Sequence, residues 1–146
     1  MSYHLAVRNT PSISKAYEAG IQALSADRHY VKVTETHDLN GSVNIDACLR
    51  AAQPNASRWD YTFGYRDQSY YVEIHPAGTG EVDTVINKFT WLINWLRTDG
   101  ARLNAINAAN PFHWVASGKV SIPLGSTYHR RIMKAGLTMP KTMLIL

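Results

Sequence analysis

The fold is decided by two runs of alternating side chains on either side of one short polar loop, WDYTFGYRDQSYYVEIH, residues 59–75. Alternation with a period of two is typical of β-strands, because their successive side chains point to opposite faces. We therefore expect strands at 59–65 and 70–75. The short loop between them, residues 66–69, predicts an antiparallel hairpin.

The length of this loop predicts which residues of the hairpin face one another. If Tyr65 faces Tyr70, Asp60 lies opposite His75, and Glu73 lies on the same face of the sheet. The other face carries aromatic and aliphatic residues and is expected to face the core. The acidic pair and the histidine are then concentrated opposite the main aromatic packing. A shift of one residue in the pairing would destroy this arrangement.

Two carboxylates on neighbouring strands repel each other unless a positive charge lies between them. A divalent cation is the natural candidate, and oxygen ligands of this kind favour Mg²⁺ or Mn²⁺. The backbone carbonyl of Ile74 is close enough along the strand to be a further ligand, and His75 is a second candidate ligand or a group that orients water. The alternative interpretation is that all three side chains are ordinary polar residues on the solvated face of an antiparallel sheet.

The flanking sequence supplies further elements. Thr10 and Pro11 are typical of a helix start, Asp38–Gly41 favours a turn, and Gly100 is expected to cap a helix in the left-handed conformation. Apolar spacing in the first two helices and turn residues between the strands predict the remaining elements. These are a helix at 11–26, strands at 29–35 and 43–50, a helix at 82–96, a strand at 112–116, a short basic helix at 126–135 and a strand at 143–146.

The pattern of Asp60, twelve further residues, and then Glu73-Ile74-His75 resembles the signature of the PD-(D/E)XK nuclease superfamily. That signature is an aspartate on one strand and a carboxylate-any-lysine triplet on the next. The resemblance implies an α/β fold with a central mixed sheet flanked by helices, built on a restriction-endonuclease-like helix-strand-strand-strand-helix-strand core. Residues 11–116 fit this order with one extra strand, and residues 1–146 are expected to form a single nuclease-like domain.

The resemblance also implies a metal-dependent hydrolysis of phosphodiester bonds in nucleic acid. Asp60 and Glu73 take the places of the two metal-binding carboxylates, and Glu18, on the expected first helix, matches a glutamate that some members add. His75 stands where the family usually has its catalytic lysine. Some members carry that lysine on the next helix, where this chain has Lys88; alternatively, His75 itself serves as acid or base. The plainer interpretations are a solvated Glu18 and a surface Lys88 whose stem packs on the helix.

Two residues of the strand expected at 43–50 need separate interpretations. Asp46 competes with Asp60 as the first carboxylate, because a strand beside 59–65 would bring it close. Cys48 is the only cysteine, so no internal disulfide forms, and it is most simply a small buried side chain. A chain without disulfides, signal peptide or long apolar stretch is expected to be cytoplasmic and not attached to a membrane.

The charge of the chain is unevenly distributed. The formal net charge is +4, yet residues 101–146 carry six basic side chains and no acidic one. Arg130, Arg131 and Lys134 cluster in the expected basic helix, which favours contacts with several phosphates at once. Nucleic acid is therefore the expected partner, although a run of charge is also typical of a solvated helix face.

Three functions remain open from the sequence, and whether the protein is an enzyme is one of the open points. The first is a nuclease that uses Mg²⁺ or Mn²⁺. The second is a catalytically inactive module of the same fold that binds nucleic acid or protein, including a second copy of the chain. The third is a metal-free ribonuclease in which two of His75, His113 and His129 act as acid and base.

Overall fold

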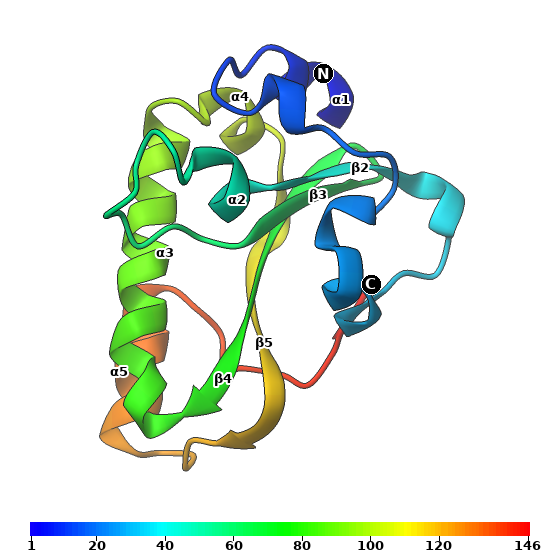
Figure 1. Ribbon diagram of the computed structural model, residues 1–146. Helices are drawn as coiled ribbons and strands as arrows, with labels where there is room; N and C mark the ends of the chain where they lie inside the picture. Colours follow the sequence, from blue (N-terminus) through cyan, green and yellow to red (C-terminus); the bar gives the residue numbers. More distant parts are fainter.

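The hairpin forms strands β3 (Tyr61–Tyr65) and β4 (Gln68–Gly78) of the computed structural model, which describes residues 1–146 (Figure 1). Its register differs from the expected one by two residues, because Tyr65 pairs with Gln68 and not with Tyr70. The turn consists of Arg66 and Asp67 alone, both with positive φ (51° and 57°). Two-residue turns of this hand match the natural twist of a hairpin.

A register shift of two residues leaves the side chains within β3 and β4 on their expected faces, because the period of a strand is also two. The shift does change the partner of Asp60. Tyr61 pairs with Val72, so the same register carried one residue further places Asp60 opposite Glu73. The two carboxylates are thereby brought closer together than the sequence had indicated.

The expected mixed sheet is present, with strand order β2-β3-β4-β5. Strand β2 (Leu39–Asn44) pairs antiparallel with β3, whereas β5 (Asn107–Ser121) runs parallel to β4. A parallel pair needs a crossover, and here α3 (Val82–Arg97) followed by the short α4 (Ala101–Asn104) provides it.

Both faces of the sheet are covered. Figure 1 shows α3 and α5 on one side of it and the C-terminal end of the chain on the other. The larger core cluster packs the sheet against α1 (Tyr3–Arg8) and α3, and a smaller cluster around Phe63 and Val72 packs beneath Leu24 and Leu144. The expectation of a single core face, with the acidic pair on the side away from it, is therefore wrong. The polar face lies under α3, within the larger core.

The helix expected at 11–26 is absent. The first helix is α1, capped by the Ser2 side chain, and the chain then forms only the 3-10 turns η1 (Ser14–Ala16) and η2 (Gln22–Tyr30). Ile13 is buried in the larger core cluster and Leu24 in the smaller one. One straight helix could not place these two side chains on opposite faces of the sheet. The segment instead passes around the free edge of β2.

Three further expectations near β2 and α3 are corrected. The Asp38–Gly41 segment is no turn, since β2 begins at Leu39 after the 3-10 turn η3 (Thr36–Asp38). The strand expected at 43–50 is wrong, because β2 ends at Asn44 and the helix α2 (Ile45–Leu49) follows. The Asn44 side chain accepts a hydrogen bond from the Ala47 amide and caps this helix. Gly100 has a φ of −88°, so it is not a left-handed cap.

The remaining elements lie at the ends of the sheet. Of the strand expected at 29–35, only Val31–Lys32 forms a strand, β1. It pairs in parallel with β6 (Leu144–Ile145) outside the main sheet. The 3-10 turn η4 (Thr79–Glu81) leads from β4 into α3, and α5 (Thr127–Ala135) contacts α3. Helix α5 follows its expected range, with Ser126 as N-cap and Gly136 (φ 97°) as the left-handed C-cap.

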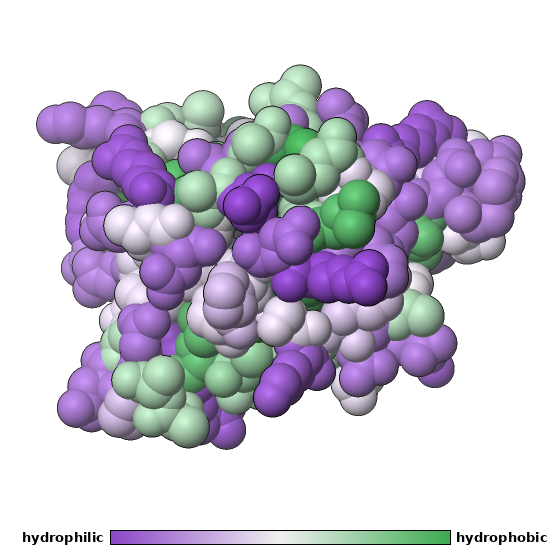
Figure 2. Space-filling model, turned by 90° about the horizontal axis from the view of Figure 1, so that it is seen from above, coloured by the Kyte–Doolittle hydropathy of each residue, from purple (hydrophilic) through white to green (hydrophobic).

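The outer surface seen from above in the orientation of Figure 1 is mostly hydrophilic, with small separate apolar patches between the polar side chains (Figure 2). Isolated apolar residues of this kind are ordinary on a protein surface. None of the helices combines the length and the hydrophobicity that a membrane crossing requires.

Candidate active site

Asp60 and Glu73 are locked together by reciprocal hydrogen bonds. The Asp60 amide donates to Glu73 Oε1 (3.0 Å), and the Ile74 amide donates to Asp60 Oδ2 (3.0 Å). Asp60 precedes the first residue of β3, so its side chain and amide extend the hairpin where the backbone pairing has stopped. Its carbonyl accepts a bond from the Ile45 amide at the start of α2 (2.8 Å). The position of the aspartate is therefore fixed by β3, β4 and α2 together.

Lys88 reaches both carboxylates from α3. Its ammonium group donates to Glu73 Oε2 and lies 3.6 Å from Asp60 Oδ1. The Glu73 side chain is 0% exposed, and those of Asp60 and Lys88 are each 19% exposed. The positive charge that two adjacent carboxylates require is thus supplied within the chain by Lys88.

His75 approaches the same oxygen of Glu73 that Lys88 contacts. Its Nδ1 lies 3.4 Å from Glu73 Oε2, and its Nε2 lies 2.7 Å from Glu81 Oε2 in η4. A carboxylate faces each ring nitrogen, so the ring is stabilised in its doubly protonated form. The hydrogen bond to Glu73, with that to Glu81, accordingly raises the pKa of His75 against the effect of burial.

The protonation of Asp60 is poised near neutral pH. Burial and the neighbouring Glu73 charge raise its pKa from 3.8 to about 7, although Lys88 and the Ile74 amide act in the opposite direction. For Lys88, burial lowers the pKa, but the charges of Glu73 and Asp60 outweigh it and the pKa is raised. Lys88 therefore stays charged while Asp60 exchanges its proton.

Asp46 and Glu18, the two other candidate carboxylates, occupy different environments. Asp46 lies in the first turn of α2 and not on a strand, and Arg58 (3.0 Å) and Arg50 (3.0 Å) both pair with it. Glu18 lies on no helix, which corrects its expected position; its backbone pairs with Ser42 on the outer edge of β2. Strand β3 separates that edge from β4, so Glu18 is not brought to the acidic pair.

The side chains present define what kind of metal site could form. No group of three or more His, Cys, Asp and Glu side chains is arranged to hold a metal ion. The available donors are one oxygen each of Asp60 and Glu73, both facing the Lys88 amine. Mg²⁺ is often held by only one or two protein carboxylates, with water and substrate phosphate as its other ligands. The acidic pair offers two such carboxylates, and the Lys88 amine occupies the position between them.

The three histidines of the metal-free mechanism do not converge. His113 pairs opposite Val72 on β5, which places its side chain on the other face of the sheet from His75. His129 lies on α5, where its Nδ1 accepts a hydrogen bond from the Gly125 amide (2.8 Å). Neither ring forms a hydrogen bond with His75, so the geometry gives this mechanism no acid and base pair.

The basic residues of α5 differ in how free they are. Arg131 forms an ion pair with Asp83 on α3. The Arg130 guanidinium donates to the Gly125 carbonyl (2.6 Å), and Lys134 is exposed and forms no ion pair. Of the three basic side chains expected to contact phosphate, Arg130 and Lys134 are the two that form no ion pair.

Sequence reasoning missed Glu81 and Arg58, which hold His75 and Asp46. The only signal for Glu81 was its place just before a helix that begins after a strand ending in histidine, and Arg58 gave none. Comparison of the chain with protein-family models, with curated proteins and with solved structures finds no match. The function is therefore inferred from the geometry of the chain itself.

Proposed function

We propose that this protein is a metal-dependent phosphodiester hydrolase acting on nucleic acid, of the PD-(D/E)XK type. The observation that carries the proposal is the convergence of Asp60, Glu73 and Lys88: two carboxylates from adjacent strands share one ammonium group from the following helix. The larger elements support it as well: α1, β2, β3, β4, α3 and β5 follow one another in this order, with the short β1, α2 and α4 inserted between them. A helix, three antiparallel strands, a helix and a fourth strand parallel to the third are the order that the resemblance to the restriction-endonuclease-like core implies.

In the proposed site, Asp60 and Glu73 hold Mg²⁺ or Mn²⁺. When bound, the ion supplies activation of water and charge stabilisation at the scissile phosphate. Lys88 takes the place of the lysine that the triplet lacks, and its ammonium group stabilises negative charge on a phosphate oxygen. His75 is held in its protonated form by Glu73 and Glu81, so it is suited to give a proton to the leaving oxygen rather than to accept one.

The substrate class follows from the charges around α3. Helix α5, which carries Arg130 and Lys134, packs against the same helix that supplies Lys88 (Figure 1). A cationic helix near a cluster of acids can hold the phosphate backbone next to the carboxylates, because its positive charges offset the repulsion between phosphates and carboxylates. The proposed substrate is therefore a polymer with several phosphates.

The test is a cleavage assay with labelled single-stranded DNA, duplex DNA and RNA, each with Mg²⁺ or Mn²⁺. We expect cleavage by the unmodified protein, none in the presence of chelator, and none by the double variant Asp60→Asn with Glu73→Gln. Binding of Mn²⁺ should disappear in the same double variant. Asp99→Asn, which changes an exposed aspartate beyond α3, is the matched control and should retain activity.

A separate variant keeps the test valid if the buried Glu73 does not tolerate substitution. Lys88→Met retains the apolar stem and removes only the charge, and it should lose cleavage while still binding Mn²⁺. Cleavage that persists in chelator with both carboxylates removed would show that the proposed mechanism is wrong. The absence of any metal-dependent cleavage by the folded protein would also contradict it.

One observation favours a second function, a binding module without catalysis. Every side chain of the cluster already has a partner within the cluster: Lys88 lies between the two carboxylates, and His75 lies between two glutamates. Such a network is stable without a metal ion. This function predicts association with nucleic acid or a protein partner that weakens with salt but produces no turnover, and charge reversal at Arg130 and Lys134 should weaken that association.

A further inference from the structure

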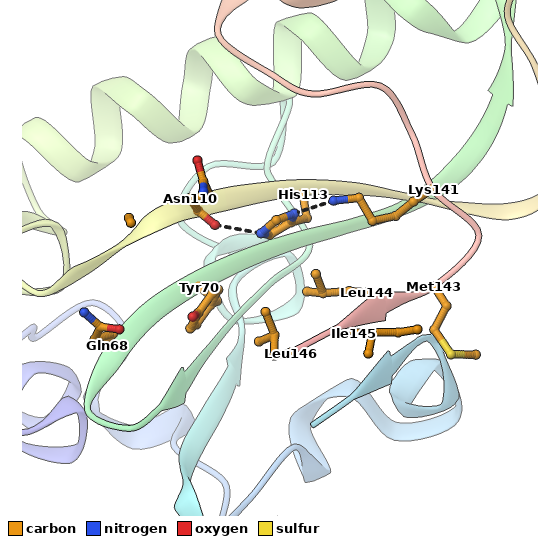
Figure 3. A pocket seen from close by; sticks show the side chains of 10 residues that line it. Gln68, Tyr70, Asn110, His113, Lys141, Met143, Leu144, Ile145 and Leu146 are labelled. Carbon is orange, nitrogen blue, oxygen red and sulfur yellow. Dashed lines mark hydrogen bonds between the residues drawn. The ribbon is translucent and has the colours of Figure 1, made fainter. Parts of the chain in front are cut away.

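A second polar cluster lies in a cavity on the opposite face of the sheet, away from α3. The cavity has a volume of about 490 Å³ and opens between the start of β4, the middle of β5 and the C-terminal segment (Figure 3). Tyr70, His113 and Lys141 line it together with Leu144, Ile145 and Leu146. Volumes of this size are ordinary for small-molecule sites.

The polar wall of the cavity is a chain of three groups in a fixed protonation state. His113 Nε2 lies 2.7 Å from the Asn110 carbonyl oxygen, which only accepts, so Nε2 carries the proton. Nδ1 is then the acceptor for the Lys141 ammonium group, 2.8 Å away. Burial and the Lys141 charge lower the pKa of His113 to about 4. The ring is therefore neutral, and Lys141, although burial lowers its pKa, is the one basic group on this wall that is left to carry charge.

Lys141 has no acidic partner. It forms no ion pair with any carboxylate of the chain, and its one side-chain hydrogen-bond partner is the neutral His113. A half-buried ammonium group without a counter-ion is costly unless another group compensates it. Two of its three N–H groups remain available for such a group.

The position of Lys141 does not depend on its side chain. Its amide donates to the Trp114 carbonyl (3.1 Å) and its carbonyl accepts from the Ala116 amide (2.7 Å), so the backbone already fastens this segment to β5. The apolar wall is likewise fixed, because Leu144 pairs with Val31 in the small β1-β6 sheet. The cavity is thus formed before any ligand enters, and the amine is free for a role other than holding the segment.

We propose that this cavity binds a small organic acid, whose carboxylate or phosphate head pairs with the Lys141 ammonium group and whose apolar body lies against Leu144 and Leu146. Figure 3 shows the geometry that supports this arrangement: Lys141 and His113 form one wall, and Tyr70 and the leucines lie below it. The Asn110 and Gln68 side chains at the rim offer amide groups for further hydrogen bonds. The site is independent of the carboxylate cluster, which lies on the other face.

The experiment measures binding of hexanoate and phenyl phosphate by calorimetry, with hexanamide as the uncharged analogue. Comparison of the two acids distinguishes a carboxylate from a phosphate head. We expect at least one acid to bind and hexanamide not to bind. Lys141→Met should weaken acid binding about tenfold or more, as expected for the loss of a charge-assisted hydrogen bond. Lys119→Met, which changes an exposed lysine at the other end of β5, should bind as the unmodified protein does.

A second measurement needs no variant. In the unmodified protein, the NMR signals of the His113 ring report its titration, and a bound anion that offsets the Lys141 charge should raise the pKa of His113 from about 4. Failure of both acids to bind would overturn the proposal, as would equal affinity for hexanamide or for Lys141→Met. None of these results depends on nuclease activity, so the two proposals stand or fall separately.

Discussion

At the scale of single residues, the carboxylate cluster is a balance of charges around one buried glutamate. The positive charges of Lys88 and His75 match the negative charges of Glu73 and Glu81, and Asp60 is the acid left over. Burial, and then the Glu73 charge, raise the pKa of Asp60 to about 7 even though a lysine lies beside it. A cation that binds the pair would favour the ionised aspartate and release its proton.

The stability of the protein should report this proton. Between pH 4 and 7 native Asp60 holds a proton that the unfolded chain has lost, so its contribution to the free energy of unfolding falls as pH rises and then levels off. In Asp60→Asn this loss is absent. Relative to the unmodified protein, the variant should become progressively more stable from pH 4 to 7, by at most about 4 kcal/mol at roughly 1.4 kcal/mol per pKa unit.

Urea denaturation of both proteins at several pH values measures this difference. Other groups titrate in the same range: the lowered pKa of His113 makes stability rise with pH below about 6.5, and the raised pKa of His75 makes it fall above that value. Both histidines are present in both proteins and so largely cancel in the difference. A stability difference that is constant with pH would show that Asp60 is not held in its protonated form.

The sequence predicted the residues of the carboxylate cluster better than it predicted which groups they contact. Asp60, Glu73 and His75 were placed on one face by alternation alone, and alternation survives a register shift of two residues. Lys88 entered through the family resemblance, and it does reach the pair. The pairing of Lys141 with His113 could not be predicted, because it depends on a C-terminal segment that returns to β5, which no local pattern records.

At the scale of elements, the sequence predicted α3, from its apolar stripe, and the basic helix α5 closely, but it failed at the N-terminus. Both helices present one apolar face to one core, so the sequence period and the burial agree. The segment 11–26 has helical spacing too, but its apolar residues enter two cores on opposite faces of the sheet. Tertiary packing decided the backbone there, and α1 formed upstream instead.

The close packing of α1 on β3 gives a test of this arrangement. A Cβ atom at Gly64 would lie 2.3 Å from Tyr3 Cγ, and Tyr3 is fully buried with its hydroxyl donating to Thr62. Gly64→Ala should therefore push α1 away from the sheet and reduce the free energy of unfolding by about 1–3 kcal/mol, the usual range for overpacking. The same variant should expose the first residues to limited proteolysis.

Gly80→Ala is the matched control, because no heavy atom lies within 4 Å of the added methyl group. It should leave the denaturation midpoint and the proteolysis pattern nearly unchanged. If Gly64→Ala were as stable as Gly80→Ala, the Tyr3 ring would not be seated over β3. The helix at the N-terminus would then have to be placed elsewhere.

At the scale of the whole molecule, charge is separated along the chain and then brought together by the fold. The first hundred residues carry two more acidic than basic side chains, and the rest carry only basic ones. The ion pair between Arg131 and Asp83 fastens the basic α5 to α3, the helix of Lys88. The basic α5 therefore lies on the same side of the sheet as the carboxylate cluster, and Lys141 lines the cavity on the other side.

This separation predicts how binding to DNA should depend on salt. Each phosphate contact contributes about 0.9 to the slope of log affinity against log salt concentration on duplex DNA. If Arg130 and Lys134 each contact one phosphate, changing both to alanine should lower the slope by about 2. Arg131→Ala alone should lower the slope by less than the value of one full phosphate contact, because Asp83 already pairs with the Arg131 side chain.

Fluorescence anisotropy with a labelled duplex, measured from about 50 to 200 mM salt, gives these slopes, since binding of this kind changes strongly over that range. Lys15→Ala, which changes an exposed lysine in η1, is the control and should keep the slope of the unmodified protein. If all the variants share one slope, α5 does not contact the phosphates, because a contact that releases counterions cannot be removed without changing it. The basic helix would then act only through its packing on α3, and the nucleic acid would have to approach the carboxylates from another side.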